Sequence, residues 1–248
     1  MKILYFDCTN GISGDMLLRA MAELSGIKNR IDEAVKNERL HDHGGCGHDD
    51  EPGCGHGHAH GHDHGHAHGH GRGRSWLKVR QLIEHSGFSE AARETALCIY
   101  GNIAGAEAEV HGETLETIHF HEVGRDEAIK NTLGTGMALE AVGPDMVLTS
   151  PIYDGKGTIV CSHGEIPVPV PAVMALRAKC AYDFRRADVN TEMVTPSGLA
   201  GLMGIGAVPS DKTLQQLLDG AVLTARAEAP GGRNTGRDGL KVYLIQTD

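Results

Sequence analysis

The sequence has few aromatic side chains: phenylalanine, tryptophan and tyrosine together make up 4% of its 248 residues. The large rings that fill many protein cores are therefore scarce, whereas glycine occurs 34 times. A core of this composition has to be built from leucine, isoleucine, valine, alanine and methionine, which favours small elements packed closely together. Hydrophobic residues still amount to 40% of the chain, so we expect a globular protein.

Three further absences exclude whole classes of function. No apolar run is long enough to cross a bilayer, and the opening MKILYFDC lacks the features of a signal peptide. Basic residues are outnumbered, with a formal net charge of −10, so there is no electrostatic footprint for nucleic acid or anionic lipid. The six cysteines form no C-x-x-C pair, which argues against a disulfide framework. We expect a cytoplasmic protein with no nucleic-acid or membrane partner, and a homo-oligomer stays an open option.

Apolar periodicity predicts strands and helices that alternate along the chain. The run at residues 2–7 is typical of a buried strand, and a helix is expected to follow it with Ser13 as its N-cap. Further helices are expected to begin at Ser89, Pro171 and Pro196. This alternation predicts an α/β fold, with α+β as the alternative, in which helices cover a layered mixed sheet. The remaining predicted helices cover residues 76–87 and 126–142, and the remaining predicted strands cover 117–124, 146–152, 158–162, 220–229 and 240–246.

One segment interrupts the predicted domain, which otherwise covers residues 1–248. Between residues 41 and 74 the composition collapses to glycine, histidine, aspartate and alanine, so this segment buries too little apolar surface to order itself. We expect a disordered insertion whose imidazoles bind Ni²⁺, Cu²⁺, Zn²⁺ or Co²⁺ without geometric selectivity. Its role is open between metal storage, delivery, buffering and a linker with incidental affinity, and nothing preorganises it for catalysis. The predicted ligands are His56, His58, His60, His62, His64, His66, His68 and His70.

The stretch IHFHE is a sharper metal-site signal. If it is extended, His119 and His121 lie on one face and Phe120 packs on the other. Two imidazoles on one face can share a metal ion, and Glu122 is a candidate third ligand or general base. His163, which follows a predicted strand, is a further candidate ligand. The alternative is a pair of half-buried histidines that only make hydrogen bonds.

The stretch DCTNGISGD places Asp7 at the end of a strand and Gly11, Ser13, Gly14 and Asp15 at the start of a helix. Backbone amides in such a turn bind phosphate, and the two carboxylates are candidates to hold Mg²⁺ beside it as part of a catalytic site. The alternative is a plain N-capped turn in which the glycines serve only backbone geometry.

A second helix start offers hydroxyl groups. Thr195 is the predicted N-cap of the helix that begins at Pro196, and Ser197 lies in its first turn. Both residues are candidates for binding a cofactor or substrate, although capping alone explains each of them. Loop positions of this kind often carry function.

Five stretches together resemble one family, the LarC-type nickel insertion proteins: LYFDCTNGISGDM, the histidine-rich insertion, IHFHEVG, HGEIPVPVPA and VTPSG, in this order. The resemblance implies a cyclometallase, a lyase that inserts nickel into pyridinium-3,5-bisthiocarboxylic acid mononucleotide through Ni–S and Ni–C bonds. It also implies the lactate racemase cofactor as the product, and CTP with Mg²⁺ or Mn²⁺ as a requirement. The positions that match the family motifs are Asp7, Cys8, Gly11, Ser13, Gly14, Asp15, His119, His121, Glu122, Gly124, His163, Glu165, Thr195 and Gly198.

The family resemblance also sets an expectation about a partner. Full-length members carry a further carboxyl-terminal domain associated with the CTP site, and this sequence ends at Asp248 before it. We therefore expect a separate LarC-type subunit to supply that domain, or this chain not to hydrolyse CTP unaided. Two alternatives stay open: a nickel or zinc storage and delivery chaperone without catalysis, and a paralogue that acts on another nucleotide.

Overall fold

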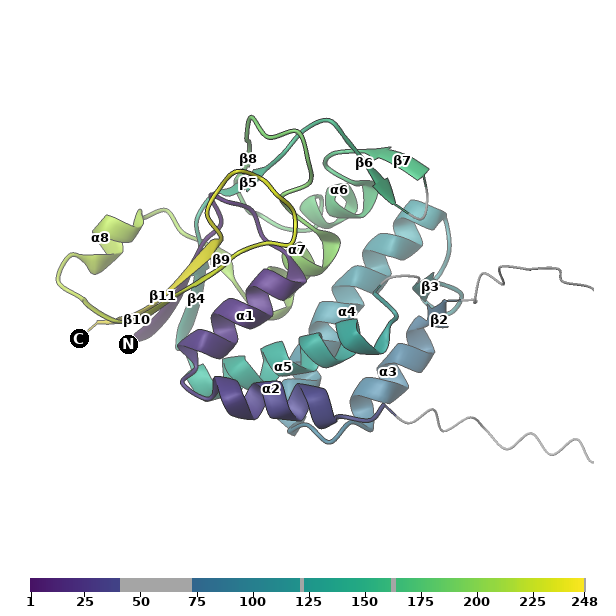
Figure 1. The fold of residues 1–248 in the computed structure, drawn as a ribbon, viewed down its shortest axis with the longest axis horizontal. Helices are drawn as coiled ribbons and strands as arrows, with labels where there is room; N and C mark the ends of the chain where they lie inside the picture. The colour runs from purple at the N-terminus through teal and green to yellow at the C-terminus, as the bar shows by residue number, and fades with distance from the viewer. Residues whose placement is uncertain (41–72, 121–122, 162–163, 248) are drawn as a thin grey trace, which may run out of the picture.

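The computed structural model describes residues 1–40, 73–120, 123–161 and 164–247 (Figure 1). Of the predicted histidine-rich insertion at 41–74, residues 41–72 lie outside the described chain, as do His121, Glu122 and His163. Arg74 begins a short strand, so the disorder predicted for this end of the insertion is wrong. The helices are α1 (Gly14–Leu24), α2 (Lys28–Asn37), α3 (Trp76–Glu84), α4 (Glu90–His111), α5 (Asp126–Val142), α6 (Pro171–Arg177), α7 (Pro196–Gly204) and α8 (Leu214–Leu218). The strands are β1 (Lys2–Asp7), β2 (Arg74–Ser75), β3 (His119–Phe120), β4 (Met146–Thr149), β5 (Ile152–Asp154), β6 (Thr158–Cys161), β7 (Gly164–Pro167), β8 (Phe184–Arg186), β9 (Val208–Pro209), β10 (Val222–Ala229) and β11 (Leu240–Gln246).

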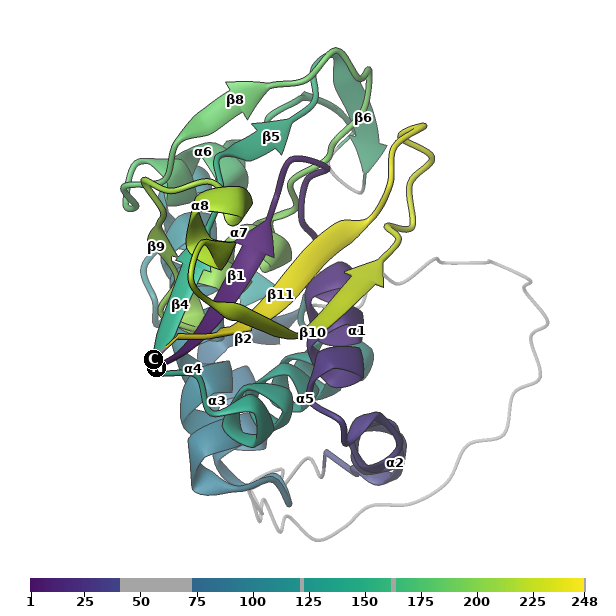
Figure 2. The same ribbon diagram turned by 90° about the vertical axis from the view of Figure 1, so that its left-hand side faces the viewer.

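A mixed five-stranded sheet in the order β10-β11-β1-β4-β9 forms the centre of the fold (Figure 2). Strands β1, β4 and β9 run parallel to one another, whereas β11 is antiparallel to both of its neighbours. The predicted α/β class with a mixed sheet is therefore confirmed. In the described parts of the chain, no helix is both long and apolar enough to span a membrane.

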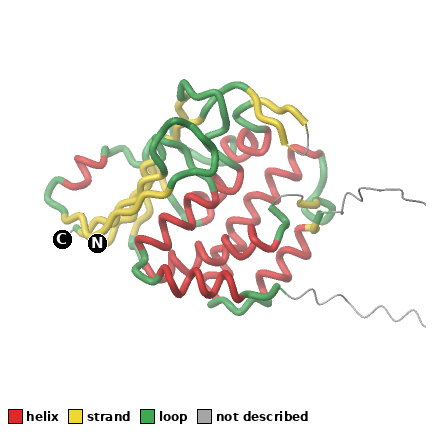
Figure 3. Tube along the Cα trace, viewed as in Figure 1, coloured by secondary structure: helices red, strands yellow, loops and turns green. Residues whose placement is uncertain are grey.

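Strand β1 is buried on both of its faces, which explains its unbroken apolar sequence. Leu4 and Phe6 point into the main core, whereas Ile3 and Tyr5 point to the opposite face of the sheet. On that opposite face Leu217 of α8 packs against Ile3 and Tyr5. The other helices gather on the main face, so the sheet lies between a thick helical layer and one short helix (Figures 1 and 3).

Glycines let the helices approach one another closely. A Cβ atom on Gly136 of α5 would lie 2.4 Å from the Ala92 carbonyl oxygen of α4. One on Gly204 of α7 would lie 2.4 Å from Ile99 Cγ1, which also belongs to α4. Gly201 meets Leu17 of α1 at the same 2.4 Å. The few aromatic residues and many glycines are thus consistent with a core of small side chains in which helix backbones pack closely.

The predicted helix starts are confirmed. Ser13, Ser89 and Thr195 each accept a hydrogen bond from a main-chain amide of the helix that they cap, and Pro171 and Pro196 lie in the first turns of α6 and α7. The predicted helices 76–87 and 126–142 are present as α3 and α5, and the strands at the carboxyl end as β10 and β11.

Two predicted strands need correction. The single strand expected over residues 146–152 is wrong, because β4 ends at Thr149 and β5 begins at Ile152 in a different, two-stranded sheet. Pro151 lies between them and has no N–H group to continue the ladder. The strand expected over residues 117–124 is limited to His119–Phe120 in the described chain.

Candidate functional site

Three adjoining hollows form one candidate site on the helical side of the sheet. The largest has a volume of about 520 Å³ and lies between the end of α4, β3, the β6–β7 hairpin and the start of α7. A hollow of about 190 Å³ lies under the loop that joins β10 to β11, and one of about 150 Å³ lies between α1, α4 and α5. Thr195, Glu192 and Arg233 line both of the first two, and Asp15 lines both of the smaller ones. Because they share these residues, the three hollows are neighbours in one part of the fold.

The starts of α1 and α7 meet at the floor of the site. The Ile12 amide donates to the Met193 carbonyl at 2.9 Å, and the Thr195 amide donates back to the Ile12 carbonyl at 3.0 Å. Ser13 and Thr195 lie next to this contact and cap their helices, so two helix N-termini converge here. The sequence placed these two starts apart, and the structure brings them together.

The glycines at this junction permit the close approach. Gly11 has φ +83°, and a Cβ atom there would lie 2.3 Å from the Met193 carbonyl oxygen. A Cβ atom on Gly14 would lie 3.0 Å from Ser197 Oγ, and one on Gly198 would lie 2.5 Å from the Ile12 carbonyl oxygen. Backbone geometry therefore explains these glycines, and a direct binding role for Gly11 and Gly14 stays a prediction.

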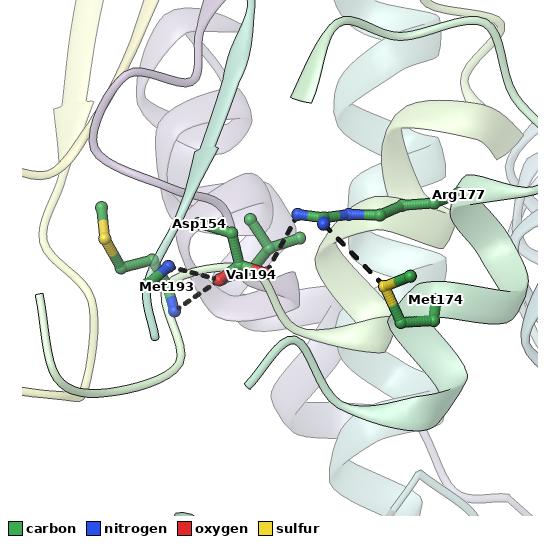
Figure 4. Close-up of polar contacts among 6 residues, drawn as sticks. Asp154, Met174, Arg177, Met193 and Val194 are labelled. Carbon is green, nitrogen blue, oxygen red and sulfur yellow. Dashed lines mark hydrogen bonds and ion pairs between the residues drawn. The ribbon is translucent and has the colours of Figure 1, made fainter. Parts of the chain in front are cut away.

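A buried carboxylate orders the strand that leads into α7 (Figure 4). Asp154, at the end of β5, is 1% exposed and accepts hydrogen bonds from the amides of Met193 and Val194 at 3.2 and 3.1 Å. Its other oxygen accepts from Arg177 Nη2 at 3.2 Å, and Arg177 lies 4.2 Å above the Phe184 ring. Burial raises the pKa of Asp154, although the amides and Arg177 oppose this shift. Asp154 thus fixes the segment on which Thr195 depends.

The segment that carries His119 is anchored from three sides. Phe120 is 1% exposed and packs with its ring centroid 6.0 Å from Tyr100 and 6.4 Å from Trp76. The Tyr100 hydroxyl donates to the Val123 carbonyl at 2.7 Å. Phe120 therefore faces the core as predicted, whereas His119 is exposed, and both line the hollow of about 520 Å³.

The ring of His119 is held by one hydrogen bond. Its Nδ1 lies 2.7 Å from the Thr117 carbonyl oxygen, which only accepts, so Nδ1 donates in this contact and Nε2 is the candidate ligand atom. His111 and Cys161 line the same hollow, with His111 Nε2 3.4 Å from Glu107 Oε2. Within the described residues no three histidine, cysteine or acidic side chains are placed to hold a metal ion together. The other predicted ligands, His121, Glu122, His163 and the alternate histidines from His56 to His70, lie outside those residues.

The two aspartates of the first motif do not share a hollow. Asp7 Oδ1 accepts hydrogen bonds from the Thr9 amide and hydroxyl at 3.1 and 2.7 Å, and Asp7 lines none of the three hollows. Asp15 is exposed in the first turn of α1 and lines the two smaller ones. The pairing of Asp7 with Asp15 around one divalent ion stays a prediction.

Sequence reasoning missed two residues of the site. Glu192 is 5% exposed and forms an ion pair of 2.9 Å with Arg233, and both line the two hollows that meet at Thr195. Arg233 lies in the turn-rich stretch GGRNTGRDG between β10 and β11. An arginine inside a glycine-rich loop was the available signal, because such a loop brings the backbone near a ligand.

The α/β fold carries a polar floor and a hollow with a histidine on its wall, which is the arrangement of a protein that binds a small ligand. A model of the nickel insertion protein family matches residues 4–212, and the chain belongs to that family. The resemblance stated from the motifs is thereby confirmed.

Three relatives named pyridinium-3,5-bisthiocarboxylic acid mononucleotide nickel insertion protein match the chain. The relative from Akkermansia muciniphila is 38% identical over 100% of this chain and 61% of its own length. The relative from Lactiplantibacillus plantarum is 37% identical over 99% and 62%, and that from Acetivibrio thermocellus is 35% identical over 80% and 50%. The chain thus spans about half to three fifths of these relatives. No solved structure matches it.

Proposed function

We propose that this chain inserts nickel into pyridinium-3,5-bisthiocarboxylic acid mononucleotide, the nucleotide in the names of its relatives. One observation supports this most: the hollow of about 520 Å³ has apolar walls for a flat ring, a histidine on its wall and a polar floor. Nickel and the nucleotide are both substrates in this proposal.

Each part of the site has a role in the proposed reaction. The pyridinium ring packs between apolar side chains that include Ile159, Ile166 and Val170, while His119 Nε2 presents Ni²⁺ to it. His121, Glu122 and His163 are proposed as further ligands, with Glu122 also accepting the ring proton as nickel bonds to carbon. The apolar walls exclude water and favour this loss of the proton.

Further parts of the proposal concern activity beyond the site. We propose a cyclometallase of the lyase class that acts in the cytoplasm for the lactate racemase system, with residues 1–248 as one unit and residues 41–74 as its metal-binding insertion. A homo-oligomer is compatible with this proposal. Thr195 and Asp15, which line the hollow of about 190 Å³, and Ser197, which lines the other two, contact the nucleotide at the floor. Among the described residues no group of three or more histidine, cysteine or acidic side chains is placed to hold a metal ion, and we assign CTP and its divalent ion to a carboxyl-terminal LarC-type unit.

A reconstitution assay tests the proposed reaction. The purified chain is incubated with NiCl₂ and the bisthiocarboxylate nucleotide, with and without the carboxyl-terminal part of a full-length relative, CTP and Mg²⁺ or Mn²⁺. Mass spectrometry is expected to find a product that has gained nickel and lost the ring proton. Failure to form it under every condition, with the chain folded by circular dichroism, would refute the proposal.

A further inference from the structure

We propose that Arg233 binds the phosphate of a pyridinium mononucleotide and that the buried Glu192 holds it in place for this task. This inference rests on the proposed function, because it assigns one part of the same substrate. Arg233 lines both the hollow of about 520 Å³ and that of about 190 Å³, so it lies where the two meet. Its loop lies over α1, where a Cβ atom on Gly231 would lie 3.2 Å from Met16 Sδ.

Charge singles out Arg233 within the site. Among the described residues that line these two hollows it is the only lysine or arginine, while the whole chain carries a formal net charge of −10. A phosphate monoester entering an acidic protein needs a local cation, and a guanidinium matches the geometry of phosphate oxygens. Asp15, Asp238 and Glu192 line the smaller hollow too, so Arg233 is its one described basic side chain among three acidic ones.

The ion pair with Glu192 orients Arg233 and uses only part of its hydrogen-bonding capacity. Glu192 is 5% exposed and accepts from Arg233 Nη2 at 2.9 Å, whereas 47% of the Arg233 side chain is exposed. A guanidinium has five N–H donors in a rigid fork, so one contact with Glu192 leaves donors for a ligand. The buried carboxylate therefore acts as a positioning residue that orients the arginine before the substrate arrives.

The two hollows then divide the substrate between them. The larger one is walled by apolar groups, among them Val123, Ile159 and Ile166, and takes the ring. The smaller one is bordered by the Ser13 and Thr195 caps and takes the phosphate, with Arg233 at the boundary. The site should therefore discriminate a nucleotide from the corresponding nucleoside.

Binding measurements that need no nickel chemistry test the proposal. Nicotinic acid mononucleotide and its riboside serve as probes, titrated by calorimetry into the full chain and into Arg233→Gln, Arg233→Lys and Arg237→Gln. Arg237 lies on the same loop but lines neither hollow, so its variant is the matched control. We expect Arg233→Gln to weaken mononucleotide binding about tenfold or more, the loss of a charge-assisted hydrogen bond, and to leave riboside binding unchanged. Arg233→Lys keeps a cation beside Glu192 and should keep part of the preference.

The proposal is overturned if the wild-type chain does not prefer the mononucleotide to the riboside. It is equally overturned if Arg233→Gln weakens both probes alike, or if Arg237→Gln lowers the preference as much. Thermal unfolding of each variant shows whether it is folded. If Arg233→Gln is not folded, Arg233→Lys is used for the comparison instead. If the chain shows no nickel insertion but still prefers the mononucleotide to the riboside through Arg233, the proposed function is refuted. The assignment of Arg233 to the phosphate then still holds.

Discussion

His119 is the one residue of the predicted IHFHE metal ligands that lies in the described chain. A second histidine, His85, makes the same kind of contact, since its Nδ1 lies 2.8 Å from the Gln81 carbonyl oxygen at the end of α3. His85 is exposed and does not line the hollow that His119 lines. The two histidines make the same kind of contact and differ in location, which makes them a matched pair for testing where nickel binds.

We predict that His119→Ala lowers the Ni²⁺ affinity of the folded site about tenfold or more, because a ligand nitrogen is lost. His85→Ala should leave the affinity unchanged. Both substitutions are made in a chain whose residue 41–72 histidines are replaced by serine, so that this segment does not mask the folded site. Calorimetric titration with Ni²⁺ is the measurement, and equal affinities in the two variants would remove His119 from the nickel site.

The pKa of Asp154 links the ordering of the site floor to pH. Because burial raises this pKa, the folded protein holds the Asp154 proton more tightly than the unfolded chain does. The stability contributed by this linkage is fully present below the ordinary pKa of 3.8 and is lost as the pH rises through the raised folded value. Replacing Asp154 by an uncharged residue should therefore cost less stability at pH 7 than at acidic pH.

We predict that Asp154→Asn lowers the free energy of unfolding by about 1–3 kcal/mol at pH 4, since the amide nitrogen replaces one acceptor oxygen. At pH 7 the loss should be smaller, because the wild-type protein has by then given up the stability that the bound proton supplied. Urea denaturation at the two pH values checks both statements. A loss that grows with pH would mean that Arg177 and the main-chain amides outweigh burial.

At the scale of elements, two glycines inside helices have opposite surroundings. Gly136 of α5 lies against α4, where an added Cβ atom would be 2.4 Å from the Ala92 carbonyl oxygen. Gly101 of α4 has no atom within 4 Å of the same added Cβ atom. Helix propensity favours alanine over glycine at both positions, so the packing alone separates them.

We predict that Gly136→Ala destabilises the protein by about 1–3 kcal/mol, because α4 and α5 are forced apart. Gly101→Ala should stabilise it by about 0.5–1 kcal/mol, because alanine loses less conformational freedom on folding. Thermal unfolding of both variants gives the comparison. Equal effects on the two melting temperatures would show that α4 and α5 do not pack as closely as described.

The elements with local signals were predictable from the sequence, and those without them were not. Ser13, Ser89 and Thr195 act through an amide three residues further along, so the helix starts they define are encoded locally. Helix α2 has no side-chain cap, so no local signal marked where it begins. The sheet order was not predictable either, because β1 pairs with β11 from the far end of the chain.

The site likewise combines residues with a local sequence signal and contacts that no local signal predicts. Ser13 and Thr195 were each recognisable as a helix cap, yet their convergence depends on the bridge between Ile12 and Val194, which are far apart in sequence. Glu192 and Arg233 also come from distant segments, and no spacing in the sequence relates them. The sequence therefore marked several members of the site but not the hollow that joins them.

At the scale of the whole molecule, the chain returns from residues 41–72 directly beside the proposed nickel ligand. Strand β2 begins at Arg74 and pairs with β3 so that Ser75 lies opposite His119. Arg74 also donates to the Gly124 carbonyl at 3.0 Å and forms an ion pair with Asp126 at the start of α5. The carboxyl end of the histidine-rich segment is thus tied to the wall of the hollow, which favours local supply of nickel to the site.

We predict that replacing the histidines between residues 41 and 72 by serine lowers the number of Ni²⁺ ions bound per chain, since imidazole is the ligand there. Nickel insertion should keep its rate at saturating Ni²⁺ and slow at limiting Ni²⁺, because the segment supplies the metal and the folded site performs the reaction. A variant with the same residues in scrambled order keeps every histidine and should match the wild-type chain in both conditions. Elemental analysis and the insertion rate are the measurements. If the serine variant lost insertion at saturating Ni²⁺ while still folded, the histidines themselves would be essential, and a delivery chaperone would describe this protein better than an enzyme.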